Sequence, residues 1–330
     1  MNFLLIRFSS IGDVVLTTYI PDAIKKKYPA AKIFYACSAR FKTLVEEHPN
    51  INQVLDYERM SLSDIAAFCK VNEVRIALDL HGSLRSRLLC LLLRLKSIRV
   101  LRYKKYLLRR WLMVNFKRRI PAIPAVRERY NSMLLKLGTS AEDTFNHLIP
   151  AKQLPESLSK KLPSSYIVWC IGATHETKKF PTSKIHEVAQ HLPLPVVLLG
   201  GKTEQDEGTR LSSAHSEKII SVCGECSLTE SALIIRNAAL IISNDTGMMH
   251  LAAASGKPLI SIWGGTVPEL GFAPDVPETK HVLIQNESLN CRPCHSKGLP
   301  NCPLRHFNCM RQLEPNTILT AAKQLLSTYL

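Results

Sequence analysis

The chain has 330 residues, 46% of them hydrophobic, and its 43 Lys and Arg against 27 Asp and Glu give a formal net charge of +16. Two domains of ordinary size fit this length, and so strong a basic excess indicates an anionic partner. No uncharged apolar run reaches the ~18 residues of a membrane-spanning helix, and the amino terminus has neither a basic leader nor a small-residue cleavage site, so we expect a cytoplasmic protein.

The first half of the chain alternates strand-length apolar runs with helix-length segments. Residues 3–8 (FLLIRF) form the first run, and apolar side chains then recur every fourth residue from Leu16 to Tyr28, which is typical of a helix with one buried face. Pro21 lies inside this helix, so we expect a kink there. Asp13 lies in the preceding turn, at the carboxyl end of a strand, where open α/β sheets bind ligands.

Further strand-length runs cover residues 32–36, 54–57 and 76–80, and the last of them ends in a polar loop at Asp79 to Gly82. Segments long enough for helices separate these runs. The first half therefore has the alternation of strands and helices that is typical of a parallel sheet.

A strongly basic stretch follows. It contains 13 Lys or Arg residues and no Asp or Glu: Arg85, Arg87, Arg94, Lys96, Arg99, Arg102, Lys104, Lys105, Arg109, Arg110, Lys117, Arg118 and Arg119. The stretch could be a solvated face, a nucleic-acid groove with Tyr103, Tyr106 and Trp111 for base stacking, or a surface for anionic lipid headgroups. Acids usually intersperse a solvated face, and no recognised nucleic-acid-binding module is present, so these observations weigh against the first two interpretations.

The second half repeats the alternation. Residues 152–165 are rich in Pro, Ser and charge, and we expect the interdomain linker there. Strand-length runs follow at 166–173, 196–200, 219–222, 240–243, 259–263 and 281–284, and residues 315–330 have the apolar spacing of a final amphipathic helix. The fold class is therefore α/β, and two doubly wound halves that face each other across a cleft are the simplest architecture for this pattern.

The polar turn NDTG has the composition of a ligand-binding turn. Asp245 and Thr246 suit the cap of the following helix, and Gly247 lets a ligand approach the backbone. Helix amino ends carry unpaired N–H groups, so this turn is a natural site for a phosphate or a sugar hydroxyl. His250 shares a helical face with Thr246, and Lys178 follows an earlier strand, so both can supply further donors.

The fingerprints of the commonest nucleotide-binding folds are missing. No GxGxxG occurs, and although Gly201, Lys202 and Thr203 resemble the end of a phosphate-binding loop, Val196 stands where that loop needs glycine. Neither a dinucleotide oxidoreductase nor a P-loop ATPase is favoured.

Four of the ten cysteines cluster late in the chain: Cys291, Cys294, Cys302 and Cys309. Their spacing allows a structural zinc site, because two close thiols and a second pair can surround a tetrahedral ion. The alternative is a set of reduced, packed or partly paired thiols.

Several segments together resemble the ADP-heptose:lipopolysaccharide heptosyltransferase family, glycosyltransferase family 9. They are SSIGDVVLTT at 9–18, TKKFP at 177–181, GG at 200–201, NDTGMMHLAAASGKPLISIWG at 244–264, CRPC at 291–294 and CPLRHFNCM at 302–310. The resemblance runs in order through nearly the whole chain. It implies an inverting enzyme of GT-B architecture that needs no metal and no cofactor, and no DxD pair stands in a loop after an apolar strand.

The resemblance also implies a domain plan. An acceptor-binding Rossmann-like domain would cover residues 1–155, and a nucleotide-sugar-binding Rossmann-like domain would cover residues 166–312. The helix over 315–330 would then cross back and pack on the amino-terminal domain.

Site residues follow from the resemblance position by position. Asp13 matches the catalytic base, with a simple helix-capping role as the alternative. Lys178 and Thr174 match phosphate-binding groups, with Lys179 as the neighbouring alternative to Lys178. The other donor-side candidates are Gly201, Glu204, Asp245, Thr246, Gly247, Met248 and His250. The acceptor-side candidates are Ser10, Gly12 and Arg85, with Arg127, Arg129 and Tyr130 downstream, and an ordinary surface role is the alternative for the arginines and Tyr130.

The implied reaction is transfer of heptose from ADP-heptose to a sugar hydroxyl of the lipopolysaccharide inner core. The alternatives are a transferase that uses another nucleotide-linked sugar, and a non-catalytic protein that binds anionic lipid or RNA on the same scaffold. With an acceptor in the membrane, the basic stretch is interpreted as a peripheral contact with the inner face of the cytoplasmic membrane, and no nucleic acid is expected as a partner. The resemblance favours late cysteines that hold no metal.

Overall fold

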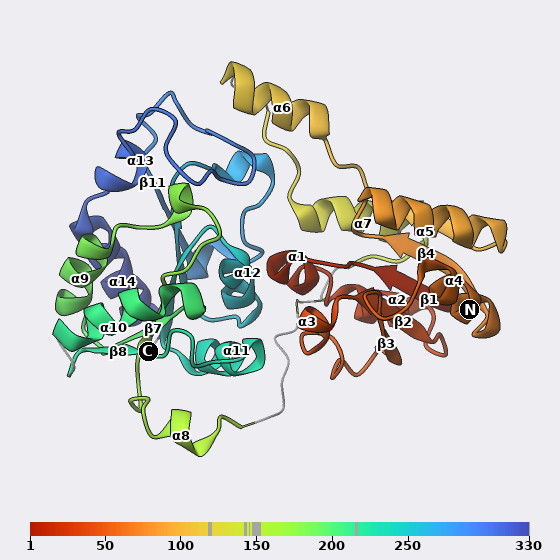
Figure 1. Ribbon diagram of the computed structural model, residues 1–330, viewed down its shortest axis with the longest axis horizontal. Helices are drawn as coiled ribbons and strands as arrows, with labels where there is room; N and C mark the ends of the chain where they lie inside the picture. Colours follow the sequence, from red (N-terminus) through yellow and green to blue (C-terminus); the bar gives the residue numbers. More distant parts are fainter. Residues whose placement is uncertain (118–120, 142–143, 145, 147–152, 215–216, 330) are drawn as a thin grey trace. The chain divides into compact units, whose positions relative to one another are not determined.

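A computed structural model describes residues 1–117, 121–141, 144, 146, 153–214 and 217–329 (Figure 1). Arg118 and Arg119 of the basic stretch, residue 152 of the expected linker and Leu330 of the final helix lie outside the described residues. The chain forms two compact units. The first contains Met1–Tyr106 and Pro124–Pro150, and the second contains Leu107–Ile123 and Ala151–Leu330.

The first unit is built on a five-stranded parallel sheet in the order β3-β2-β1-β4-β5. The strands are β1 (Asn2–Ile6), β2 (Ile33–Cys37), β3 (Gln53–Asp56), β4 (Val74–Asp79) and β5 (Arg99–Arg102). Because β1 and β2 are buried along almost their whole length, both read as continuous apolar runs in the sequence. The strand order reverses between β1 and β4, and this switch point is where an open α/β sheet binds its ligand.

The helices of the first unit are α1 (Ile11–Val15), α2 (Ile20–Lys27), α3 (Ala39–Lys42), α4 (Leu62–Val71), α5 (Leu84–Leu95) and α7 (Val126–Lys136). The single kinked helix expected between Leu16 and Tyr28 is wrong. α1 ends at Val15, and α2 starts at Ile20 with Pro21 in its first turn. Proline fits a first turn because the amide it lacks would have no partner inside the helix.

The second unit contains a six-stranded parallel sheet in the order β11-β10-β9-β6-β7-β8. The strands are β6 (Ile167–Cys170), β7 (Val196–Leu199), β8 (Ile219–Ser221), β9 (Leu240–Asn244), β10 (Leu259–Trp263) and β11 (His281–Gln285). From β6 the chain builds β7 and β8 on one side and then β9, β10 and β11 on the other. The switch point therefore lies between β6 and β9, and the loops after these two strands are neighbours.

The remaining helical segments belong to the second unit. They are α6 (Leu107–Phe116), α8 (Glu156–Ser159), η1 (Glu176–Lys178), α9 (Thr182–His191), η2 (Lys202–Glu204), α10 (Gln205–Ala214), α11 (Leu228–Asn237), α12 (Gly247–Ala254), η3 (Pro268–Leu270), η4 (Glu278–Lys280), α13 (Asn308–Arg311) and α14 (Pro315–Tyr329). Among the described residues, no helix combines the length and the apolarity needed to cross a bilayer.

The segment around α6 belongs to the second unit, although the expected amino-terminal domain over 1–155 contained it. The Arg110 guanidinium lies 4.4 Å from the centre of the Phe272 ring, and the Ile123 amide donates to the Glu269 carbonyl at 2.8 Å. Lys117 donates to the Pro293 carbonyl. These contacts tie the carboxyl-terminal part of the basic stretch to the second unit.

The final helix α14 also packs within the second unit, against α9 and strands β9, β10 and β11. Its buried side chains Ile318, Ala322 and Leu325 belong to the same apolar core as Ile262 and Phe180. Whether this helix also packs on the amino-terminal domain, as the resemblance implies, stays a prediction.

Candidate functional site

The first group of candidate residues lies just after β1, at the switch point of the first sheet. Asp13 is the third residue of α1, and Ser10, not Asp13, holds the N-cap position. The Ser10 hydroxyl donates to Asp13 Oδ2 at 3.1 Å, and the Arg7 guanidinium forms an ion pair with the same oxygen. The Asp13 side chain is 28% exposed while that of Arg7 is 7% exposed. The carboxylate is thus held from the protein side and open toward solvent.

Arg7 is a functional candidate that sequence reasoning missed. Its Nη1 donates to the Leu80 carbonyl at 2.5 Å, and the Tyr130 hydroxyl donates to the same carbonyl at 3.1 Å. Burial alone would lower the pKa of Arg7, but the Asp13 carboxylate and nearby tyrosines raise it above its ordinary value. The guanidinium therefore stays charged. The sequence signal that could have identified Arg7 is its place as the one charged residue in the apolar run at 3–8.

His81 lies beside this group on the loop after β4. Its ring centre is 5.2 Å from that of Phe8. Burial, together with the positive charges of Arg7 and Lys105, lowers the pKa of His81 to about 4. This imidazole is therefore neutral near pH 7, which makes it a poor proton donor in this state.

The remaining acceptor-side candidates have different surroundings. Gly12 is buried inside α1. Arg85 instead lies over the Tyr57 ring at 4.7 Å and donates to the Tyr57 carbonyl at 3.4 Å. Arg127 stacks over Tyr19 at 4.1 Å. Arg129 and Tyr130 are buried, which leaves Tyr130 as a support of the Arg7 site.

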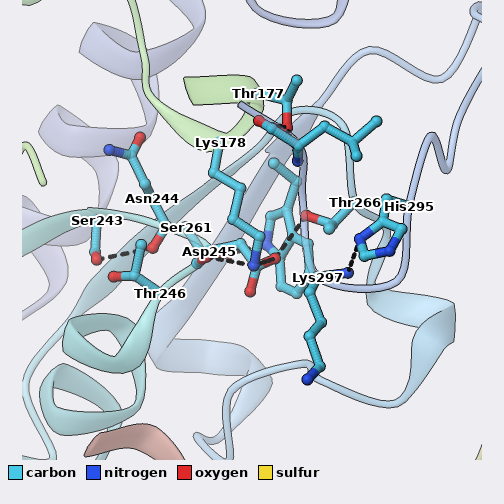
Figure 2. A network of polar contacts seen from close by, with 12 residues as sticks. Thr177, Lys178, Ser243, Asn244, Asp245, Thr246, Ser261, Thr266, His295 and Lys297 are labelled. Carbon is cyan, nitrogen blue, oxygen red and sulfur yellow. Dashed lines mark hydrogen bonds and ion pairs between the residues drawn. The ribbon is translucent and has the colours of Figure 1, made fainter. Parts of the chain in front are cut away.

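The second group lies at the switch point of the second sheet, on the neighbouring loops after β6 and β9 (Figure 2). Lys178 Nζ is 2.7 Å from Asp245 Oδ2 and donates to the Asp245 carbonyl at 2.9 Å. Thr266, on the loop after β10, donates its hydroxyl to Asp245 Oδ2 at 2.6 Å. The Asp245 side chain is only 5% exposed, against 15% for Lys178. Asp245 is therefore a buried anchor that fixes the Lys178 ammonium at the edge of the sheet.

Asn244 and two glycines bring these loops together. The Asn244 side chain accepts from the Phe180 amide at 3.2 Å and donates to the Ile171 carbonyl at 3.1 Å, so it joins β9 to the loop after β6. The Gly265 amide donates to the Thr177 carbonyl at 2.8 Å. A Cβ at Gly264 would lie 2.5 Å from the same carbonyl oxygen, so only glycine permits this approach.

Arg292 fixes the loop that carries Thr266. Its guanidinium is buried and donates to the carbonyls of Gly264 at 2.5 Å, Asn286 at 2.6 Å and Thr266 at 2.8 Å. Arg292 thus holds Thr266, which in turn orients Asp245. The sequence offered Arg292 only as the residue between two cysteines, and nothing in its spacing pointed to Thr266.

The expected cap of α12 is half confirmed. Thr246 is the N-cap, and its hydroxyl accepts from the Met248 amide at 3.3 Å. Asp245 does not cap, because its carboxylate is turned to Lys178 and Thr266. Gly247 begins the helix, Met248 is half-buried and His250 is buried. The amino end of α12 therefore directly follows the residue that anchors Lys178.

Glu204 forms a separate cluster at the carboxyl end of β7. Its Oε2 accepts from the Gly201 amide at 3.0 Å, and its Oε1 is 3.4 Å from Lys179 Nζ. A Cβ at Gly172 would lie 2.9 Å from Glu204 Oε2, so the loop after β6 passes directly beside this carboxylate. The two adjacent lysines consequently have different partners: Lys178 binds Asp245, and Lys179 binds Glu204 and, at 2.8 Å, Glu176.

Thr174 is not brought into either cluster. It is exposed on the loop between β6 and η1, and its hydroxyl bonds to no other residue in the described part of the chain. Its assignment as a phosphate contact stays a prediction.

The late cysteines are free thiols, as are the other six. Cys291 Sγ lies 3.9 Å from His306 Nε2, and the Cys294 thiol donates to the Cys291 carbonyl at 3.6 Å. Within the described ranges, no group of three or more His, Cys, Asp or Glu side chains is arranged to hold a metal ion. The geometry therefore gives the zinc interpretation no support.

Solved structures with two such parallel sheets share this fold. The structure of E. coli ADP-heptose lps heptosyltransferase II matches with a TM-score of 0.74 and 21% identity, and each chain is covered over 99%. An E. coli heptosyltransferase with ADP matches with a TM-score of 0.67 and 19% identity over 100% of each chain. The fold is thus the GT-B fold of glycosyltransferases, with two Rossmann-like parallel sheets of five and six strands.

A family profile described as glycosyltransferase family 9 (heptosyltransferase) matches residues 69–303, and the chain belongs to this family. Lipooligosaccharide heptosyltransferase 2 of Campylobacter jejuni is 32% identical over 130 residues, which are 38% of this chain and 39% of that protein. Lipooligosaccharide heptosyltransferase 2 of Haemophilus influenzae is 23% identical over 330 aligned positions, covering 90% of this chain and 93% of that protein.

Proposed function

We propose that this protein is an inverting, metal-independent glycosyltransferase that moves heptose from ADP-heptose to a hydroxyl of the lipopolysaccharide inner core. The observation that carries the proposal is the Lys178–Asp245–Thr266 cluster at the switch point of the second sheet. A fixed ammonium beside a helix amino end is suited to a phosphate-bearing ligand. The E. coli heptosyltransferase structure with ADP has the same fold, and it supports the proposal that this chain also binds a nucleotide.

In this proposal Asp13 is the catalytic base. The acceptor oxygen attacks the anomeric carbon from the face opposite ADP, and its proton passes to the Asp13 carboxylate. The bond from the anomeric carbon to the β-phosphate oxygen breaks, and ADP leaves with the electron pair. Arg7 and Ser10 keep the carboxylate ionised and oriented, which is what a base needs.

The donor side must neutralise the charge that develops on ADP. Lys178 is assigned to the pyrophosphate with the amides at the start of α12, and Asp245 positions Lys178. The other residues given this role by the resemblance are Thr174, Gly201, Glu204, Thr246, Gly247, Met248 and His250. In the same scheme, residues 1–155 bind the acceptor, with Ser10, Gly12 and Arg85 as candidates, and residues 166–312 bind the nucleotide sugar.

The acceptor places the enzyme at a membrane surface. Lipopolysaccharide inner core is held in a bilayer by its lipid, and the basic stretch from Arg85 onward complements anionic headgroups. We therefore propose a cytoplasmic enzyme that binds peripherally to the inner face of the cytoplasmic membrane.

Calorimetric titration with ADP, UDP and GDP tests the donor assignment. ADP should bind more tightly than the other two nucleotides, and product analysis with ADP-heptose should show inversion at the anomeric carbon. Equal affinities would favour the rival assignment, a transferase that uses another nucleotide-linked sugar. Turnover should continue in the presence of EDTA.

The two adjacent lysines allow a matched test of phosphate binding. Lys178→Met should weaken ADP binding about tenfold or more, since a charge-assisted hydrogen bond contributes about 1.5–3 kcal/mol. Lys179→Met removes the same charge from a side chain that is paired with Glu176 and Glu204 instead. A larger loss in Lys179→Met would transfer the phosphate role to Lys179.

A further inference from the structure

Helix α5 exposes a stripe of leucines on the first unit. Leu84, Leu88, Leu91 and Leu95 are 76%, 49%, 54% and 75% exposed. Their spacing of four, three and four residues puts them on one helical face, within about 60° of the helix circumference at about 100° per residue. A soluble surface rarely keeps four aligned leucines without a use for them.

The opposite face of α5 holds the helix in place. Ser86, Leu89, Cys90 and Leu93 are buried, and α5 packs on α4, β4 and β5. The Ser83 hydroxyl caps the helix by accepting from the Ser86 amide at 3.2 Å. The leucine stripe therefore lies on the face of α5 opposite its buried side chains, and the packing of α5 on the sheet does not use these leucines.

Cationic side chains border the leucine stripe. Arg87 and Arg94 are exposed, and both lie next to the leucine stripe on the same side of it around the helix. Arg85 lies on the other side of the stripe. In the described part of the chain, neither Arg87 nor Arg94 forms a salt bridge. No Asp or Glu occurs between Arg85 and Arg119, so nothing in this stretch of sequence neutralises the positive border.

We propose that α5 is a membrane-docking helix, with the leucine stripe entering the outer edge of the hydrocarbon layer and Arg87 and Arg94 binding anionic lipid headgroups. An amphipathic helix with leucines on one face and arginines beside them lies in the plane of the bilayer surface in this way. The inference rests on the proposed function for its biological setting and names the segment that makes the membrane contact. A second copy of the chain is the weaker occupant, because pairing two stripes would bring their arginine borders together.

Vesicle co-sedimentation tests the apolar contact. The probe is a set of vesicles of phosphatidylcholine and phosphatidylglycerol in equal parts, with pure phosphatidylcholine vesicles for comparison. Leu88→Ser together with Leu91→Ser should weaken binding to the anionic vesicles about tenfold or more, since each buried CH₂ contributes about 0.8 kcal/mol. The matched control is Val71→Ser with Leu304→Ser, which removes two exposed apolar side chains elsewhere (81% and 60% exposed).

The same vesicles test the charged border. Arg87→Ser with Arg94→Ser should weaken binding about 30-fold, at about 1 kcal/mol for each basic residue near an anionic surface, and should reduce its salt dependence. Lys70→Ser with Arg75→Ser removes the same charge from exposed positions on the same unit and should have a smaller effect.

Two results would overturn the docking assignment. One is a leucine variant that binds anionic vesicles as tightly as its control. The other is sedimentation equilibrium that shows a dimer of the unaltered chain which the leucine variant dissociates. Turnover on a soluble, lipid-free core fragment is measured in parallel and should not change in the α5 variants. If the unaltered chain shows no turnover on this fragment but still binds the vesicles, the proposed function is refuted and the docking assignment of α5 is not.

Discussion

The ion pair between Arg7 and Asp13 sets the character of the proposed base. A carboxylate beside a buried guanidinium is favoured in its ionised form, so it is ready to accept a proton near neutral pH. The same ion pair also makes the carboxylate a weaker base, because the positive guanidinium stabilises its ionised form. Ser10 and the Leu80 carbonyl fix the geometry of the pair on its two sides.

Replacing Arg7 should move the pH dependence of turnover. In Arg7→Met the carboxylate loses its positive neighbour, so the acid limb of kcat/KM should shift to higher pH. Arg7→Lys should restore part of the original profile because it keeps the charge. A simple loss of folded protein would lower the rate without moving the limb, so the full pH–rate profile is the measurement.

Thr266 should affect donor binding through Asp245. Thr266→Val removes the hydroxyl that donates to Asp245 Oδ2 and keeps the side chain's volume. The loss of one such hydrogen bond costs about 0.5–3 kcal/mol, so ADP affinity should fall by about twofold to a hundredfold. Calorimetry measures this. An unchanged Kd for Thr266→Val would show that Asp245 needs no such support.

The sequence predicted the charged candidate residues, but it did not predict the residues that orient them. Lys178, Asp245 and Glu204 all follow the carboxyl ends of strands. They could be predicted because each lies in a short motif that is recognisable from neighbouring residues alone. Arg7, Thr266 and Arg292 act through partners far along the chain, such as Leu80 for Arg7 and Gly264 for Arg292. Such pairings depend on sheet order, which no local pattern encodes.

At the scale of elements, buried parallel strands were the most predictable part of the fold. The runs around β1, β2, β9 and β10 are almost entirely apolar because both faces of each strand are covered. The edge strand β5 was missed, since its sequence RVLR has arginines at both exposed ends. It lies at the edge of its sheet, where charged residues are common.

The final helix gives a stability test at this scale. Ile318 is fully buried where α14 packs on the second sheet, so Ile318→Ala should lower the free energy of unfolding by about 2–5 kcal/mol. Lys323→Ala, on the exposed face of the same helix, should change it by less than about 0.5 kcal/mol. Urea denaturation followed by circular dichroism measures both. Equal, small effects would mean that α14 contributes little to the core.

At the scale of the whole molecule, a histidine in each unit makes stability depend on pH. Burial is the largest cause for both, and it lowers the pKa of His81 and of His281 from 6.5 to about 4. His281 Nε2 lies 2.8 Å from the Ser261 hydroxyl, which also accepts from the Trp263 indole at 2.9 Å. Protonation of either ring is therefore easier in the unfolded chain than in the folded protein.

This linkage has a definite sign. Between pH 6.5 and about 4 the unfolded chain binds more protons than the folded protein, so stability is present above pH 6.5 and is lost as the pH falls toward about 4. His281→Gln should reduce the difference in free energy of unfolding measured at about pH 7.5 and about pH 5. A difference as large as that of the unaltered chain would assign the acid sensitivity to other groups.

The central assignment is tested most directly by the rate of heptose transfer in Asp13→Asn. Mass spectrometry of a core fragment incubated with ADP-heptose gives that rate, and calorimetry with ADP on the same sample checks the second unit. We predict that the unaltered chain adds heptose, that Asp13→Asn is slower by about a hundredfold or more, and that its ADP affinity is unchanged. An Asp13→Asn protein that transfers heptose at the original rate would contradict the account.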